Sequence, residues 1–314
     1  MFRKILIATD FSKASRAALG AAIRLAEQGS ARVEALHVCT LNDYAYVGYP
    51  LVVPTSSLQA DLDGKLEDFF PNKLFPNSAR HVILGHSISD EIQEFARKNG
   101  FDLIVLGSHG KGSIGRFLLG SVTQKVTRDS EIPVMVVRDV EHSKERYQGF
   151  RRILTPTDFS ETSDMAAKFG IEFANFLKAD FHYIHVIDLA TVTDLTGLYP
   201  FLLMKIPATE GMDVNLTLQK DLSKEYFVGN QKVATLIGDP VREILKYSEE
   251  HDIDFIVMGT HGRKGMDRFL LGSVAAGVVV RSKVPVITVS TGQKVLQNVE
   301  LPVLSEQPEY KQGS

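Results

Sequence analysis

Two glycine-rich segments have the residue types and spacing of a phosphate-binding loop. Residues 107–121 read Gly-Ser-His-Gly-Lys-Gly-Ser-Ile-Gly-Arg-Phe-Leu-Leu-Gly-Ser, and residues 259–273 read Gly-Thr-His-Gly-Arg-Lys-Gly-Met-Asp-Arg-Phe-Leu-Leu-Gly-Ser. Each segment follows an apolar, strand-like run and precedes a helical pattern. Glycines at such a junction let backbone N–H groups and the positive end of the helix dipole face one point. An anionic ligand is the expected occupant of both loops.

The repetition extends over nearly the whole chain. Thr9-Asp-Phe-Ser12 returns as Thr157-Asp-Phe-Ser160, and Ile132-Pro-Val134 returns as Val284-Pro-Val286. The offset grows from 148 residues (9 to 157) to 152 residues (132 to 284), so the second copy carries about four extra residues after its second strand. Such a repeat indicates two homologous domains. We expect domains at 1–139 and 151–290, an exposed charged connector at 140–150 and a polar tail at 291–314.

Composition and charge narrow the class of protein. A chain of 314 residues with 44% hydrophobic and 23% charged residues is long enough for two ordinary globular domains. The formal net charge of −3 offers no argument for binding to nucleic acid or to a membrane surface. Cys39 is the single cysteine, and the N-terminal apolar run is too short for a secretory signal. These features favour a cytoplasmic protein without a disulfide framework.

Hydrophobic periodicity predicts alternating strands and helices. In the first copy, the helix that Ser12 caps ends at Gln28, with Gly29 as its stop. The strands are expected at 4–8, 32–38, 81–84, 103–106 and 134–137, and the helices at 13–28, 57–70, 89–99 and 121–130. The second copy repeats this plan. The pattern indicates an α/β fold with a parallel sheet and helices on both faces, and ligands of such sheets lie beyond the carboxyl ends of the strands.

The glycine spacing resembles a known family. Gly-x2-Gly-x9-Gly-Ser is met by Gly107, Gly110, Gly120 and Ser121, and again by Gly259, Gly262, Gly272 and Ser273. This is similar to the ATP-binding signature of universal stress proteins of the UspA class, and the Thr-Asp-Phe-Ser start and Val-Pro-Val ending also match. The resemblance covers both copies and implies a tandem arrangement of two such domains, each an open five-stranded parallel sheet in the order 3-2-1-4-5.

The resemblance also implies the ligand and its contacts. ATP, with Mg²⁺ or Mn²⁺, would lie across the ends of the first and fourth strands of each domain. Aspartates would contact the adenosine part, a valine of the second strand would hold adenine, and the glycine loop and following serine would hold ribose and phosphates. The assigned nucleotide-binding residues are Thr9, Asp10, Val38, Gly107, His109, Gly110, Gly120, Ser121, Val122 and Thr123 in the first copy and Thr157, Asp158, Val186, Gly259, His261, Gly262, Arg263, Gly272, Ser273 and Val274 in the second.

The two copies differ where phosphate is expected. Thr123 follows Gly-Ser-Val in the first copy, and its hydroxyl is placed to reach a phosphate oxygen, whereas Ala275 replaces it in the second. Arg263 and Lys264 add positive charge to the second loop, where the first has only Lys111. Both sites are expected to be competent, with the first slightly favoured.

Several assigned residues have a structural alternative. Asp10 and Asp158 are residue types that also favour turns and caps. His109 and His261 either touch phosphate or face solvent or backbone, and Ser121 and Ser273 are N-caps and phosphate donors rather than nucleophiles. His182 and His185 point to opposite faces of a strand and cannot chelate one metal ion together. No catalytic residue and no metal site is assigned.

Three classes of function remain open from the sequence. The first is a nucleotide-binding stress or signalling protein whose partner interactions depend on ATP occupancy. The second is a slow ATP hydrolase, for which no water-activating carboxylate is evident, and the third is a scaffold for a non-nucleotide ligand. The apolar fifth strands predict pairing of the two halves within the chain, because an exposed edge strand must be covered. A further homodimer and an unidentified protein partner are compatible with this arrangement, while membrane and nucleic-acid partners are not expected.

Overall fold

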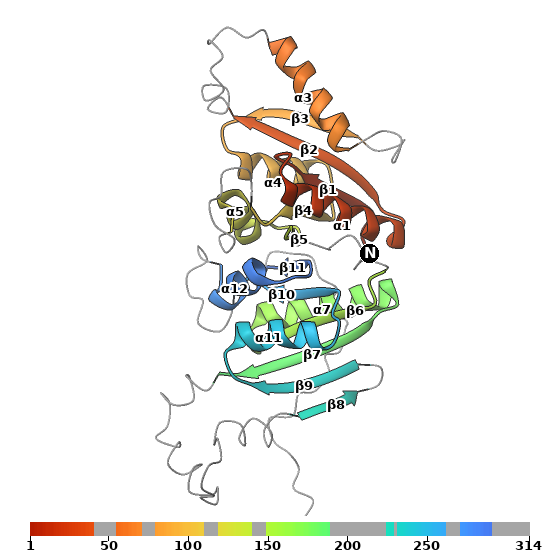
Figure 1. The fold of residues 1–314 in the computed structure, drawn as a ribbon, viewed down its shortest axis with the longest axis vertical. Coiled ribbons are helices and arrows are strands. Elements are labelled where there is room, and N and C mark those ends of the chain that lie inside the picture. The colour runs from red at the N-terminus through yellow and green to blue at the C-terminus, as the bar shows by residue number, and fades with distance from the viewer. Residues whose placement is uncertain are drawn as a thin grey trace, which may run out of the picture.

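One continuous sheet joins the two halves of the chain (Figure 1). The computed structural model describes residues 1–40, 55–70, 79–109, 119–139, 149–188, 224–228, 231–261 and 271–290. Within these residues, eleven strands lie in the order β3-β2-β1-β4-β5-β11-β10-β6-β7-β9-β8. Each half is therefore an α/β unit with a mostly parallel sheet, and the predicted fold class is confirmed.

The first half contains five parallel strands and four helices among the described residues. They are, in chain order, β1 (Lys4–Ala8), α1 (Lys13–Gly29), β2 (Arg32–Thr40), α3 (Thr55–Phe69), β3 (Arg80–Gly85), α4 (Ile88–Lys98), β4 (Leu103–Gly107), α5 (Ser121–Asp129) and β5 (Val134–Val137). The predicted bounds of β1 and β5 are met, and the other bounds differ by one or two residues.

The second half repeats most of this plan. Its described elements are β6 (Arg152–Thr157), α7 (Glu161–Leu177), β7 (Asp180–Ile187), β8 (Lys224–Val228), β9 (Gln231–Ile237), α11 (Pro240–Glu250), β10 (Phe255–Gly259), α12 (Ser273–Arg281) and β11 (Val286–Val289). Asp239 caps α11 by accepting from the Arg242 N–H, with Pro240 in the first turn, as the sequence predicts.

The second half departs from the predicted five-stranded parallel sheet. An additional strand, β8, pairs antiparallel with β9 at the outer edge, with Val228 opposite Gln231. The remaining five strands are parallel and lie in the order β11-β10-β6-β7-β9. The predicted counterpart of α3 falls on residues outside the described part of the chain, as do the polar tail and most of the connector.

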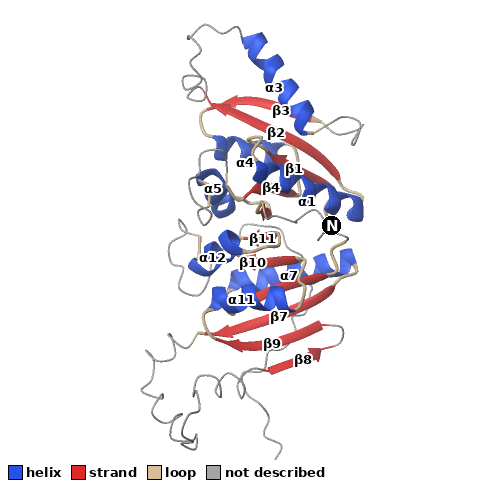
Figure 2. Ribbon diagram, viewed as in Figure 1, coloured by secondary structure: helices blue, strands red, loops and turns tan. Residues whose placement is uncertain are grey.

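Helices cover both faces of the sheet (Figure 2). Apolar side chains of α1, α3 and α7 pack with the strands in one core, and those of α4, α5, α11 and α12 pack in the other. Both cores contain residues of the two halves. Alanine-rich α1, with Ala18, Ala21 and Ala22 fully buried, permits a close approach to the strands. Every helix among the described residues is too short or too polar to span a bilayer.

The halves meet through their fifth strands. β5 and β11 pair antiparallel, with Met135 opposite Ile287. Two hydroxyls add bonds across this seam: Thr288 Oγ1 donates to the Val134 carbonyl oxygen at 3.2 Å, and Ser290 Oγ donates to the Ser130 carbonyl oxygen at 2.9 Å. The edge strands that the sequence leaves exposed in each domain are thus covered by each other.

A second junction lies on the face of α1 and α7. The ring of Phe2 packs against Phe169 and Phe173 of α7, with centroid distances of 6.0 and 5.6 Å. Gln28 at the end of α1 donates to the carbonyl oxygens of Phe150 and Leu177 at 3.3 and 3.1 Å. The two halves therefore share aromatic packing and side-chain hydrogen bonds as well as a sheet.

Two sequence predictions are wrong at this junction. Phe150, assigned to an exposed connector, is only 1% exposed, and its ring centroid lies 4.2 Å from that of Phe255. Gly29 is the last residue of α1 rather than its stop; Ser30 caps the helix in the left-handed region with φ 54°. A Cβ on Gly29 would lie 2.7 Å from the Phe176 ring, so contact between the halves explains the glycine.

Candidate functional site

In each half, the Thr-Asp-Phe-Ser turn and the start of the glycine loop leave the carboxyl ends of two neighbouring strands. β1 pairs with β4, with Ile7 opposite Val105, and β6 pairs with β10, with Leu154 opposite Ile256. The turn that follows β1 or β6 and the glycine loop that follows β4 or β10 are therefore neighbours. This arrangement is the one expected if a ligand lies in a crevice across the ends of these two strands.

The Thr-Asp-Phe-Ser turn is built by its own side chains. Thr9 Oγ1 accepts from the Phe11 N–H at 2.9 Å, and Asp10 Oδ1 accepts from the Ser12 N–H at 3.0 Å. The equivalent bonds of Thr157 and Asp158 measure 3.0 and 3.1 Å. Both threonine hydroxyls also bond a serine hydroxyl in the first turn of the following helix at 3.0 Å. The turn role that the sequence left open for the aspartates is therefore present in both halves.

The phenylalanine of this turn has a strained backbone in both halves. Phe11 and Phe159 lie in the left-handed region of backbone conformation, with φ 65° and 60°. Residues other than glycine rarely adopt this conformation. Each ring packs on a histidine of the second strand, His37 or His185, at a centroid distance of 4.5 Å. A backbone conformation of this kind is retained only where surrounding contacts hold it in place, and it is frequent at functional sites.

The same two histidines fix the carbonyl group that precedes the aspartate. His37 Nδ1 lies 2.7 Å from the Thr9 carbonyl oxygen, and His185 Nδ1 lies 2.8 Å from that of Thr157. A carbonyl oxygen only accepts, so Nδ1 carries the proton in both rings. The turn is thus held from the second strand as well as from its own side chains.

Val38 and Val186 lie on the second strands, one residue beyond these histidines. Val38 is buried in the core beneath α4 and pairs with Ile83 across the sheet, and Val186 is partly exposed and pairs with Leu236. Both valines precede the carboxyl end of a strand that neighbours β1 or β6. Both valines therefore lie near the strand ends where the ligand is expected, but their side chains pack in the core.

The glycine loops close on themselves at their base. The Gly120 N–H donates to the Ser108 carbonyl oxygen at 2.9 Å, and the Gly272 N–H donates to that of Thr260 at 2.8 Å. Gly120 and Gly272 are the N-caps of α5 and α12, and no side chain of the described residues caps either helix. The helix N-terminus is therefore brought next to the strand end. Gly110, Gly262 and Arg263 lie outside the described residues.

The serine after each N-cap is the first residue of the helix. Ser121 and Ser273 are exposed, and Val122 and Val274 are partly buried against the core beneath them. The prediction that the serines are N-caps is therefore wrong by one position. Their backbone N–H groups remain in the first turn, where the helix dipole attracts anions.

Thr123 has a bond that the sequence analysis did not foresee. Its Oγ1 donates to the Gly107 carbonyl oxygen at 2.8 Å, and the residue is 6% exposed. A hydroxyl has one proton, so this proton is used within the protein rather than offered to a phosphate. Ala275 occupies the equivalent position of the second half and is also buried.

Gly107 and Gly259 are required by close packing of strand and helix. A Cβ on Gly107 would lie 2.7 Å from the carbonyl carbon of Ala14 and 2.8 Å from the Ser15 nitrogen. On Gly259 it would lie 2.9 Å from the carbonyl carbon and oxygen of Thr162. These are backbone atoms of α1 and α7, which cannot turn aside.

Gly107→Ala is expected to lower the free energy of unfolding by about 1–3 kcal/mol, as overpacking of a tight site does. Gly20→Ala is the matched control, because a Cβ there meets nothing within 4 Å and Gly20 lies inside α1. The control should gain about 0.5–1 kcal/mol from helix propensity. Urea unfolding of both variants measures the difference, and equal stabilities would contradict the packing argument.

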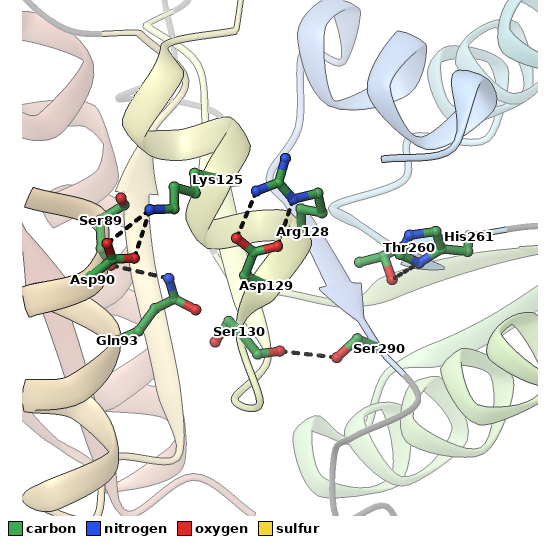
Figure 3. A network of polar contacts seen from close by, with 10 residues as sticks. All are labelled: Ser89, Asp90, Gln93, Lys125, Arg128, Asp129, Ser130, Thr260, His261 and Ser290. Carbon is green, nitrogen blue, oxygen red and sulfur yellow. Dashed lines mark hydrogen bonds and ion pairs between the residues drawn. The ribbon is translucent and has the colours of Figure 1, made fainter. Parts of the chain in front are cut away.

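Each loop histidine bonds the residue before it. His109 Nδ1 lies 2.8 Å from Ser108 Oγ. His261 Nδ1 lies 2.9 Å from Thr260 Oγ1 (Figure 3). The His261 carbonyl oxygen accepts a hydrogen bond from Thr162 Oγ1 of α7. The His261 Nε2 atom is buried and has no hydrogen-bond partner among the described residues.

The two sites differ in charge beside the turn, which the sequence analysis missed. Lys13 and Arg16 stand in the first turn of α1, whereas Glu161 and Asp164 stand at the equivalent positions of α7. Burial raises the pKa of Asp164; Lys168 opposes this in part, and the Asp158 carboxylate adds to the rise. Alignment of the two repeats shows the inversion directly.

Helix α5 is tied to α4 in the first half. Lys125 Nζ lies 2.8 Å from the Asp90 carboxylate, and the bond to Lys125 holds the pKa of Asp90 below its usual value (Figure 3). Gly277 replaces Lys125 in α12, and a Cβ there would lie 2.7 Å from a methyl group of Val241. Direct helix packing thus takes the place of the ion pair in the second half.

Two cavities among the described residues lie away from these loops. One cavity, of about 590 Å³, is lined by the ends of α1 and α7 near Gln28 and Phe150. It lies at the amino ends of the strands, opposite the glycine loops. The other, of about 360 Å³, lies between α4 and the end of α5. Residues 110–118 and 262–270 of the two glycine-rich segments lie outside the described part of the chain. We locate the candidate site by strand ends, strained turns and helix N-termini, since these features coincide in both halves.

Comparison with known proteins gives a consistent result. The Universal stress protein family model matches residues 1–138 and 149–290. A universal stress protein of Methanocaldococcus jannaschii is 34% identical over 148 residues, which is 46% of this chain and 85% of the relative. One of Mycobacterium bovis is 28% identical over 199 residues, 60% of this chain and 62% of the relative. The crystal structure of a universal stress protein from Archaeoglobus fulgidus matches with a TM-score of 0.60 and 22% identity, covering 91% of this chain and 98% of that one.

Proposed function

The chain belongs to the universal stress protein family, and we propose that it binds an adenine nucleotide in each half and acts in a stress response or in signalling through partner interactions that depend on this occupancy. ATP is the proposed ligand. Mg²⁺ or Mn²⁺ would accompany its phosphates, because such ions are commonly held through the phosphates themselves. The domains proposed to carry the sites are residues 1–139 and 151–290, in a cytoplasmic protein.

One observation carries the proposal: in both halves an uncapped helix N-terminus is bound back to a strand end. The Gly120 and Gly272 N–H groups close the loop bases, and the first-turn N–H groups of α5 and α12 follow. A site of this kind attracts anions through oriented N–H groups and the helix dipole. The absence of a Cβ at the N-cap leaves room for a phosphate oxygen to approach the backbone.

The neighbouring turn supports an adenosine contact. Asp10 and Asp158 stand at the end of the strand beside each glycine loop, in a turn where the Thr9 and Thr157 hydroxyls accept from the Phe11 and Phe159 N–H groups. A fixed carboxylate at this place suits ribose hydroxyls, which donate hydrogen bonds. The arrangement thus offers anion-binding donors on one side of the crevice and an acceptor on the other.

The charge difference favours the first site for ATP. Lys13 and Arg16 raise the local potential beside the turn of the first half, and Glu161 and Asp164 lower it in the second. The opposite trend comes from Arg263 and Lys264 of the second loop. We propose that both sites bind, with the first tighter.

Gly120→Val and Gly272→Val are expected to weaken nucleotide binding by at least about tenfold, each in its own half, because a branched side chain blocks approach to the backbone. Gly120 and Gly272 have φ −61° and −53°, which valine adopts, so the change is local. Isothermal titration of the full chain with ATP measures both sites, and Gly20→Ala serves as the control. Unchanged titration of the Gly120→Val/Gly272→Val double variant would contradict the assigned sites.

The two alternative functions, a slow ATP hydrolase and a scaffold for a non-nucleotide ligand, predict different results with the same purified variants. A slow ATP hydrolase would release phosphate with a rate that falls in the two valine variants. A scaffold for another ligand would bind no adenine nucleotide at all.

A further inference from the structure

The first half anchors the start of its glycine loop from the helix that follows it. Thr123 Oγ1, on the first turn of α5, donates to the Gly107 carbonyl oxygen at 2.8 Å. In the second half Ala275 stands at this place in α12, and it has no hydroxyl to donate to the Gly259 carbonyl oxygen. One anchor is therefore absent from the second loop.

The second half anchors its loop from the opposite side. Thr162 Oγ1, on the first turn of α7, donates to the His261 carbonyl oxygen, and Thr162 is 6% exposed. Ala14 holds the equivalent position of α1. The equivalence is structural, since the backbone of Ala14 faces Gly107 as that of Thr162 faces Gly259.

We propose that Thr123 and Thr162 are alternative anchors that position the two glycine loops, so that the first loop is held by α5 and the second by α7. Each half has one threonine and one alanine at the two positions, in opposite order. Thr162 is then a positioning residue for the second nucleotide site, and this part rests on the proposed function.

His261 is the residue through which Thr162 acts. Its carbonyl oxygen is held by Thr162, its Nδ1 atom contacts Thr260 Oγ1 at 2.9 Å, and its Nε2 atom is buried with no partner among the described residues. The Gly272 N–H bonds the Thr260 carbonyl oxygen at 2.8 Å, which links this segment to the N-cap of α12. An anchor on His261 thus fixes the histidine ring and the helix N-terminus relative to α7.

Hydrogen exchange of the full chain without ligand tests the anchors directly. In Thr162→Ala, the Gly272 amide should exchange about 3- to 10-fold faster, the range that loss of one hydrogen bond gives, while the Gly120 amide is unchanged. Thr123→Ala should have the reverse effect. Thr162→Ser, which retains a hydroxyl, should exchange like the unaltered chain. An unchanged Gly272 amide in Thr162→Ala would overturn the proposal.

Transfer of the anchor is the sharper test. Thr162→Ala/Ala275→Thr moves the hydroxyl from α7 to α12 and should restore slow exchange at Gly272, because it recreates the arrangement of the first half. Failure of this variant to restore protection, with Thr162→Ser protected, would show that the two anchors are not interchangeable.

Titration with ATP then separates this inference from the proposed function. Thr162→Ala should weaken the second site by about 3- to 10-fold and leave the first unchanged, and the double variant should recover it. If neither site binds ATP in the unaltered chain, the proposed function fails while the exchange results still decide the anchors. If both sites bind and Thr162→Ala leaves the second affinity unchanged, the positioning role is wrong.

Discussion

Phe150→Ala is expected to lower the free energy of unfolding by about 3–5 kcal/mol, the range for removing a buried phenylalanine ring. Phe150 is 1% exposed and packs against Phe255, whose ring in turn lies 5.3 Å from that of Phe173. The Phe150 backbone is also bound on both sides by Gln28 of α1. The ring therefore supports the junction between the halves as well as the core of the second.

Urea unfolding measures this loss, with Phe150→Leu as the control because it retains most of the buried volume. The loss in the leucine variant should be well below that in the alanine variant. If Phe150→Ala cost less than about 1 kcal/mol, the packing between α1, α7 and the sheet would contribute little, and the shared core would not explain how the halves are held together.

Acidification is expected to destabilise the second half through His182. This histidine is 6% exposed, its Nδ1 atom lies 3.0 Å from the Tyr247 hydroxyl, and Tyr247 stacks on His251 at a centroid distance of 3.8 Å. Burial, with the positive groups His251 and Lys232, lowers the pKa of His182 from 6.5 to about 4. Arg152 acts in the same direction, and Asp180 opposes it.

The direction follows from proton uptake. The unfolded chain binds a proton at His182 below about pH 6.5, whereas the folded chain resists it until about pH 4. Stability from the neutral ring is therefore complete above pH 6.5 and is lost as the pH falls toward 4. The loss amounts to about 3 kcal/mol at most.

Unfolding free energies at pH 7 and pH 4.5 check this prediction. His182→Gln removes the titration and retains a hydrogen-bonding side chain toward Tyr247. The pH-dependent loss should be about 2–3 kcal/mol smaller in this variant than in the unaltered chain. Identical losses would show that His182 does not carry the acid sensitivity.

The first half has Glu34 at the equivalent position, buried and paired with Lys4, Arg32 and His81.

The repeat and the periodicity were sufficient to predict the fold class. Buried apolar runs such as Lys4–Ala8 and Val134–Val137 have clear ends, because turn or cap residues flank them. β8 escaped prediction because the second copy was expected to repeat the five strands predicted for the first. Its signal is local: Gly229 and Asn230 separate two strand-like runs, and such a two-residue pair is typical of hairpins.

The positions of the candidate site residues could be predicted where the order of strands and helices fixes the backbone. They were harder to predict where they depend on which hydrogen bonds and packing contacts a side chain makes. The strand-end glycines and the Thr-Asp turns follow from strand and helix order. Thr123 did not, because its hydroxyl donates to the Gly107 carbonyl oxygen, which is 16 residues away in the sequence and which the repeat pattern does not place beside it. Phe150 escaped because its charged neighbours in the sequence give no sign of the packing between the halves in which its ring is buried.

The central claim is that each half binds one adenine nucleotide, and native mass spectrometry of the full chain with ATP and Mg²⁺ tests it most directly. We expect the spectrum to show chains with one and two bound nucleotides, with the doubly bound form dominant at millimolar ATP. At an ATP concentration near the dissociation constant of the unaltered chain, Gly120→Val and Gly272→Val should each lose most of one bound nucleotide, and the double variant most of both. A chain that carries no nucleotide at millimolar ATP, or a double variant that is occupied like the unaltered chain at the lower concentration, would contradict the account.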